Sequence, residues 1–103
     1  MREALEARRD DVAQICARHR VKRLSLFGSA AKDRFDPKTS DVDLLVEFER
    51  MKPSEHAGHY FGLQEDLEAL LQRPVDLVEP GPIRNPYFKQ SVEASKVLLF
   101  EAA

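Results

Sequence analysis

The chain has 103 residues, a length that supports one hydrophobic core, so a single domain over residues 1–103 is expected. Its 18 acidic and 16 basic residues leave a formal net charge of −2, which lacks the strongly basic character of nucleic-acid-binding domains and disfavours a nucleic-acid partner. The only cysteine, Cys16, excludes an intramolecular disulfide, and no apolar run approaches the roughly 20 residues that cross a bilayer, so we expect a cytoplasmic protein without membrane contact.

The first half of the chain predicts two helices and two strands. Apolar residues recur at helical spacing over residues 2–20, which predicts a helix. Residues 21–28 alternate in polarity and predict a strand that ends at Gly28, after which Ser29 would cap a short helix. A turn then leads into a second strand over residues 41–49, DVDLLVEFE, whose centre is largely apolar.

The second half predicts further alternation of helix and strand. Residues 51–60 read as a loop leading into a helix, with a possible helix start near Ser54, and a leucine stripe then runs to Leu71. A third strand is expected over residues 73–82, a last helix over 83–94 and an edge strand or docked tail over 96–101. This order predicts an α/β (α+β) fold in which helices pack against one sheet of three or four strands.

Two aspartates one residue apart begin the second strand. Asp41 and Asp43 project from the same face, because residues i and i+2 of a strand share a face, whereas Val42 turns to the core. Neighbouring carboxylates repel each other unless a cation lies between them, and their hard oxygens suit Mg²⁺. If the third strand is a neighbour, Asp76 would complete a cluster with enough oxygens for two Mg²⁺ ions.

The Gly-Ser pair upstream predicts a phosphate site. Gly28 lets the backbone approach a ligand, and the hydroxyl and first-turn N–H groups of a helix starting at Ser29 would bind an anion. A nucleoside triphosphate could then lie between this helix and the metal cluster. An isolated Asp-x-Asp is more often a turn or a cap, and a strand-end aspartate such as Asp76 is often a surface residue, but the ordered combination favours a site.

Several other residues have a simpler structural interpretation. His56 and His59 could share a helix face and bind a transition metal, but no third ligand has suitable spacing, so surface histidines are favoured. His19 would end the first helix, where a charged imidazole suits the helix dipole. The aromatic pair Tyr60 and Phe61 marks either a partner surface or packing onto the sheet.

From Gly28-Ser29 to Asp41-x-Asp43 and the following Leu-Leu-Val-Glu-Phe, the chain resembles the minimal nucleotidyltransferases, or MNT-domain proteins, of the DNA polymerase β superfamily. The resemblance extends along nearly the whole length. It implies a polymerase-β-like nucleotidyltransferase fold, a small mixed sheet packed against helices with the active site at one sheet edge. It also implies that Asp41 and Asp43 ligate two Mg²⁺ ions, that Asp76 is the third ligand and activates the attacking hydroxyl, and that Gly28 and Ser29 hold the phosphates of ATP.

The chain departs from the family pattern at one place. The family often reads Gly-Ser-x-Ala-Arg-Gly, whereas Lys32 and Asp33 stand at the last two positions here. Lys32 keeps a positive charge for nucleotide binding without the two-pronged guanidinium of arginine, and Asp33 adds a negative charge.

The resemblance implies an enzyme that transfers AMP from ATP to a hydroxyl, a tyrosine of a HEPN-domain toxin, with the chain acting as antitoxin in a type VII-like toxin–antitoxin system. Two alternatives stay open. One is a non-catalytic antitoxin that neutralises a HEPN partner by binding, and the other is a nucleotidyltransferase for a small molecule or RNA. The sequence leaves the oligomeric state open, a homo-oligomer included.

Overall fold

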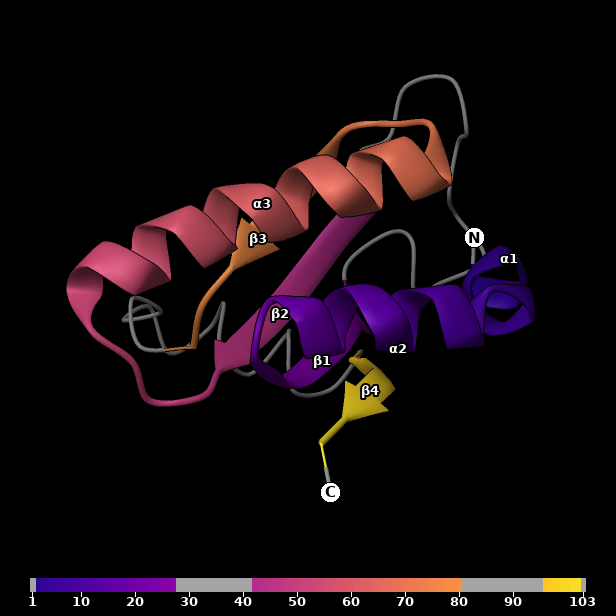
Figure 1. The fold of residues 1–103 in the computed structure, drawn as a ribbon. Helices are drawn as coiled ribbons and strands as arrows, with labels where there is room; N and C mark the ends of the chain where they lie inside the picture. The colour runs from indigo at the N-terminus through magenta and orange to yellow at the C-terminus, as the bar shows by residue number, and fades with distance from the viewer. Residues whose placement is uncertain (1, 28–41, 81–95, 103) are drawn as a thin grey trace.

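The computed structural model describes residues 2–27, 42–80 and 96–102 (Figure 1). These residues form helices and one mixed sheet, as an α+β fold requires. The elements are α1 (Arg2–Ala7), α2 (Arg9–Arg18), β1 (Val21–Phe27), β2 (Val42–Phe48), α3 (Pro53–Leu71), β3 (Val75–Val78) and β4 (Val97–Glu101). The helices expected after Ser29 and over residues 83–94 lie outside the described residues.

The four strands are ordered β3-β2-β1-β4. β1 lies antiparallel to both β2 and β4, whereas β2 and β3 run parallel. Parallel neighbours need a crossover connection, and α3 supplies it between β2 and β3. The same helix therefore covers the sheet and sets the position of β3.

One face of the sheet carries the main hydrophobic core. Side chains of α2 and α3 pack there against alternate residues of β1 and β2, and Figure 1 shows the two helices on the same side of the sheet. Burying each leucine or valine stabilises the fold by roughly 1.5–3 kcal/mol. The most deeply buried members are Leu5, Val12, Cys16, Val21, Leu24, Leu26, Val42, Leu44, Val46, Leu63 and Leu67.

The opposite face of the sheet carries a smaller apolar cluster. Phe27 and Leu45 are buried there, and Val78 packs against them. Because strand side chains alternate, Asp43 lies on this face together with Leu45, while Val42 and Leu44 face α2 and α3. Val42 thus turns to the core as expected.

Several expected boundaries are wrong. The strand expected over residues 73–82 covers only Val75–Val78 among the described residues. The loop expected over residues 51–60 is helical from Pro53 onward, one residue before the possible start near Ser54, because Lys52 is the N-cap and proline is favoured in the first helical turn. Gly58 and Gly62 have low helix propensity, but the packing of the leucine stripe outweighs it. The helix expected over residues 2–20 is divided at Arg8, whose φ of −109° and ψ of 24° are not helical.

Strict alternation over residues 21–28 predicts Val21 on the face opposite Leu24 and Leu26, and this prediction is wrong. The pairing register of β1 with β2 shifts between Val21 and Arg23, and this irregularity brings Val21 onto the same face as Leu24 and Leu26.

Within the described ranges, no helix is both long enough and apolar enough to cross a bilayer.

Candidate functional site

The expected site centres on the parallel pair formed by β2 and β3. Asp43 lies directly opposite Asp76, with Val42 opposite Val75 and Leu44 opposite Leu77. Paired residues of parallel strands share a face, and neighbouring strands lie about 4.8 Å apart. The two aspartates therefore start from adjacent backbone positions on the face of the sheet opposite α2 and α3.

The surroundings of the two aspartates differ. Asp43 is half-buried and lies opposite Phe27 of the neighbouring strand β1, a side chain of which only 5% is exposed. Asp76 belongs to the outer strand and is exposed. One carboxylate thus stands beside an apolar cluster, and the other faces solvent, which leaves room for a ligand to approach from the side of Asp76.

The remaining predicted site residues cannot be placed. Asp41, Gly28, Ser29 and Lys32 lie outside the described residues, so the three-carboxylate cluster and the phosphate site stay predictions. Within residues 2–27, 42–80 and 96–102, no three His, Cys, Asp or Glu side chains come together as a metal site.

Side chains of α3 contact the outer edge of β3 at several points. The Tyr60 hydroxyl donates to the Leu77 carbonyl at 2.6 Å, and the Gln64 amide donates to the Val75 carbonyl at 2.9 Å. The Val75 N–H donates to Glu68 Oε2 at 2.9 Å. The spacing of four residues between these α3 positions is visible in the sequence, but their partner is not, because it lies on a strand reached only through the fold.

The phenol of Tyr60 is held in its neutral form. Burial raises its pKa, and the negative charges of Asp76 and Glu79 raise it further. Tyr60 therefore packs on the sheet and stays a hydrogen-bond donor at neutral pH. Its neighbour Phe61 is instead 59% exposed, so the two aromatics that the sequence left ambiguous separate into one packing residue and one surface residue.

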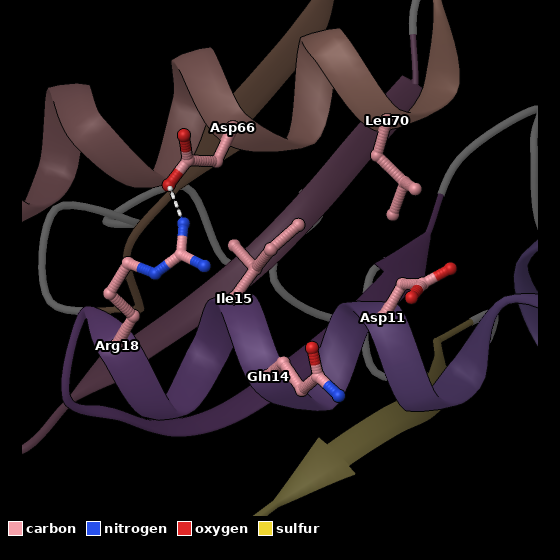
Figure 2. A pocket seen from close by; sticks show the side chains of 6 residues that line it. All are labelled: Asp11, Gln14, Ile15, Arg18, Asp66 and Leu70. Atoms are coloured by element: carbon pink, nitrogen blue, oxygen red, sulfur yellow. Dashed lines mark hydrogen bonds and ion pairs between the residues drawn. The ribbon is translucent and has the colours of Figure 1, made fainter.

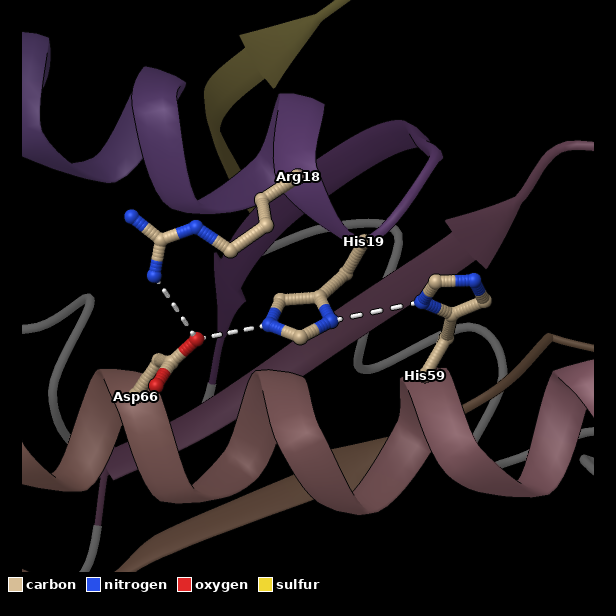
Figure 3. Close-up of polar contacts among 4 residues, drawn as sticks. All are labelled: Arg18, His19, His59 and Asp66. Atoms are coloured by element: carbon tan, nitrogen blue, oxygen red, sulfur yellow. Dashed lines mark hydrogen bonds and ion pairs between the residues drawn. The ribbon is translucent and has the colours of Figure 1, made fainter.

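A second polar cluster joins α2 to α3 on the helical side of the sheet (Figure 3). His19 Nε2 lies 2.6 Å from Asp66 Oδ2, and His19 Nδ1 lies 3.3 Å from His59 Nδ1. The hydrogen bond with His19, together with the charges of His19 and Arg18, lowers the pKa of Asp66. His19 thus ends its helix as expected, but its main partner is a carboxylate of α3.

The histidines that could have formed a metal site point to different partners. His56 Nε2 lies 2.6 Å from Glu79 Oε1, whereas His59 contacts His19. Both lie on α3 and are half-buried. Each is accounted for by a contact with another side chain.

A groove of about 350 Å³ lies between α2 and α3 (Figure 2). Its lining mixes charged, polar and apolar side chains, and the Arg18 guanidinium reaches Asp66 across it at 3.3 Å. The groove lies on the helical side, away from Asp43 and Asp76, so it is separate from the expected site. The lining residues are Asp11, Gln14, Ile15, Arg18, Asp66 and Leu70.

Comparison with known proteins agrees with this architecture. Residues 9–99 match the nucleotidyltransferase domain family. Two proteins of Methanocaldococcus jannaschii, both named "Putative protein adenylyltransferase", are 41% identical over 76 residues and 42% identical over 77 residues, and each alignment covers 74% of both chains. A solved structure described as a "putative minimal nucleotidyltransferase" is 36% identical, with a TM-score of 0.70 over 92% of each chain.

More distant structures share the fold alone. A chain of a toxin–antitoxin complex with AMP-PNP is 18% identical with a TM-score of 0.66, over 91% of this chain and 73% of that one. A chain of a Shewanella oneidensis complex, described as a tri-AMPylated HEPN toxin with its MNT antitoxin, is 17% identical with a TM-score of 0.61, over 95% and 73%. The chain resembles the minimal nucleotidyltransferases in sheet topology and over most of its length. These matches identify it as a member of the nucleotidyltransferase domain family, and thereby as a nucleotidyltransferase enzyme.

Proposed function

We propose that the protein transfers AMP from ATP, with Mg²⁺, to the hydroxyl of a tyrosine on a HEPN-domain toxin, and that it serves as the antitoxin of that partner. The observation that carries the proposal is the direct pairing of Asp43 with Asp76 across β2 and β3. The expected site needs acidic side chains from two strands at one place, and this register gives two of them adjacent backbone positions.

The side chains at this position suit a magnesium ion. Both are carboxylates, the hard oxygen ligands that Mg²⁺ takes alongside phosphate oxygens and water. Mg²⁺ bound here would lower the pKa of the attacking hydroxyl and neutralise the charge on the leaving pyrophosphate. Asp41 and Asp43 would hold two ions, and Asp76 would be the third ligand.

The exposure of the two carboxylates favours different roles. Asp76 is exposed, so the acceptor hydroxyl approaches from its side of the pair and gives its proton to a carboxylate oxygen of Asp76. Asp43 is half-buried beside Phe27, where it stays fixed in position. Gly28, Ser29 and Lys32 would hold the phosphates of ATP, the first two through backbone and hydroxyl groups and the third through its charge.

The proposed acceptor is supported by the relatives. The two archaeal proteins that share about two-fifths of aligned residues with this chain are named for adenylyl transfer to protein. The Shewanella oneidensis neighbour belongs to a complex whose HEPN toxin carries AMP groups. A tyrosine on a HEPN-domain partner is therefore the acceptor we propose.

The proposal is tested by incubating the protein with α-labelled ATP, Mg²⁺ and the product of the adjacent gene. We expect label on the partner with the wild type and with the control Asp10→Asn, an exposed residue in the first turn of α2. Asp43→Asn and Asp76→Asn should abolish labelling. A tight complex that forms without label, and that Asp43→Asn leaves intact, would support the non-catalytic antitoxin instead.

A further inference from the structure

We propose that three side chains of α3 position Asp76 for nucleotidyl transfer by holding the outer edge of β3, an inference that rests on the proposed function. These side chains, which we term the α3 clamp, are Tyr60, Gln64 and Glu68. None of them contacts the reacting groups directly in this account. They act through the backbone of β3, so they are positioning residues.

The clamp answers a structural problem of β3. This strand has only four residues and pairs with β2 along one edge. The opposite edge of such a strand presents N–H and carbonyl groups that need partners. The clamp meets three of them, because Tyr60 bonds the Leu77 carbonyl while Gln64 and Glu68 bond the carbonyl and N–H of Val75.

The periodicities of helix and strand match along this contact. Clamp residues are four apart, so they share one face of α3 and rise about 6 Å from one to the next. Two residues of a strand advance about 6.6 Å. Tyr60 therefore meets Leu77 and Gln64 meets Val75, in reverse order along the strand, and Glu68 of the next turn meets Val75 as well. One turn before Tyr60, His56 meets the side chain of Glu79, just beyond the end of β3. Figure 1 shows α3 lying along β3.

The held residues lie on both sides of Asp76. Val75 precedes it and Leu77 follows it, and both are fixed through backbone atoms. A slip of β3 by one residue would turn the Asp76 side chain to the other face of the sheet and away from Asp43. Such a slip would break all three backbone contacts of the clamp, so the clamp opposes it.

The electrostatics of Tyr60 agree with this geometry. Burial and the nearby charges of Asp76 and Glu79 raise the pKa of its phenol, so the hydroxyl keeps its proton and donates to the Leu77 carbonyl. Partners of this indirect kind matter in metal sites because they fix the orientation of the ligands themselves.

The test uses the double variant Tyr60→Phe/Gln64→Met, which keeps side-chain size and removes two donors. The control is Gln14→Met, the same change at an exposed position of α2 in the groove. Three quantities are measured: Mn²⁺ affinity by titration calorimetry, amide hydrogen exchange over β3, and kcat and KM for AMP transfer. Asp43→Asn and Asp76→Asn are measured in parallel.

We expect the double variant to bind Mn²⁺ at least about tenfold more weakly, as loss of supporting partners does in other metal sites. Exchange at Asp76 and Leu77 should quicken, and kcat should fall while the KM for ATP stays near the wild-type value. Raising the Mn²⁺ concentration should restore part of the rate. Gln14→Met should match the wild type throughout. If the double variant does not fold, Tyr60→Phe alone, which removes a single hydroxyl, should shift the same quantities in the same directions.

Two results would overturn the inference and separate it from the proposed function. Wild-type Mn²⁺ affinity and kcat in the clamp variant, with both lost in Asp43→Asn and Asp76→Asn, would leave the function standing and refute the clamp. Full transfer by Asp43→Asn and Asp76→Asn would refute the proposed function, and the positioning role of the clamp would fall with it.

Discussion

Replacing Gly62 by alanine should destabilise the protein, although the same change at Gly58 on the same helix should stabilise it. An alanine Cβ at position 62 would lie 2.7 Å from His19 Cε1 and 3.2 Å from His19 Nδ1. At Gly58 nothing lies within 4 Å of the added atom. The two glycines therefore separate a steric effect from helix propensity.

The expected magnitudes follow from the contacts. Alanine gains about 1 kcal/mol over glycine within a helix at either position. At position 62 the His19 ring must move, which weakens its bonds to Asp66 and His59, and the combined overpacking and lost hydrogen bonding cost about 2–3 kcal/mol. The net expectation is a loss of about 1–2 kcal/mol for Gly62→Ala and a gain of up to about 1 kcal/mol for Gly58→Ala.

Thermal denaturation followed by circular dichroism measures both variants. For a domain of this size, 1 kcal/mol corresponds to about 4–8 °C in Tm, so the two variants should differ by about 10 °C or more. In a His19→Ala background the obstacle is removed, and Gly62→Ala should then raise the Tm as Gly58→Ala does. Equal stabilisation by the two alanines in the wild-type background would refute the reasoning.

Two further predictions concern ionisable groups. The hydrogen bond with His19, aided by the charges of His19 and Arg18, holds the pKa of Asp66 below its usual range, so the unfolded chain binds more protons there than the folded one. The contribution of Asp66 to folding stability is therefore complete above the unfolded pKa of about 3.9 and is lost as pH falls through the lower folded pKa. Urea unfolding should show a stability difference between wild type and Asp66→Asn that shrinks over this pH range. A stability difference unchanged by pH would contradict the prediction. Burial raises the pKa of Cys16 to about 12, so a disulfide reagent should label the thiol only on unfolding, and rapid labelling of the native protein would contradict its burial.

Much of the fold follows from patterns that lie within short segments. The apolar runs around Asp43 and Asp76 predict two strands with a helix between them, and the structure has both strands. The sequence left open whether the two strands are neighbours; in the structure they pair in parallel, with the helix as their crossover. The loop expected over residues 51–60 was wrong because Gly58 and Gly62 look like helix breakers when their surroundings are unknown, although a start near Ser54 was visible. His19 approaches so closely that a Cβ at position 62 would collide with its ring, which explains the glycine there. The helix itself gives no reason for a glycine at this position.

The contacts that the sequence did not predict join distant segments. His19 and Asp66 are separated by 47 positions, and the sequence around neither residue indicates that the other is its partner. The α3 clamp has a visible spacing, but its partner is the backbone of β3, whose N–H and carbonyl groups carry no signature of residue type. Side-chain periodicity predicts which face of a helix is buried; it does not predict which polar groups that face will satisfy.

The central claim is that Asp43 and Asp76 act together on one metal-bound nucleotide, and Mn²⁺ titration in the presence of AMP-PNP tests it most directly. We predict that Asp43→Asn and Asp76→Asn each weaken Mn²⁺ binding at least about tenfold. The double variant should bind little worse than either single variant, since paired residues that share one ion lose it together. Wild-type Mn²⁺ affinity in Asp76→Asn would contradict the claim.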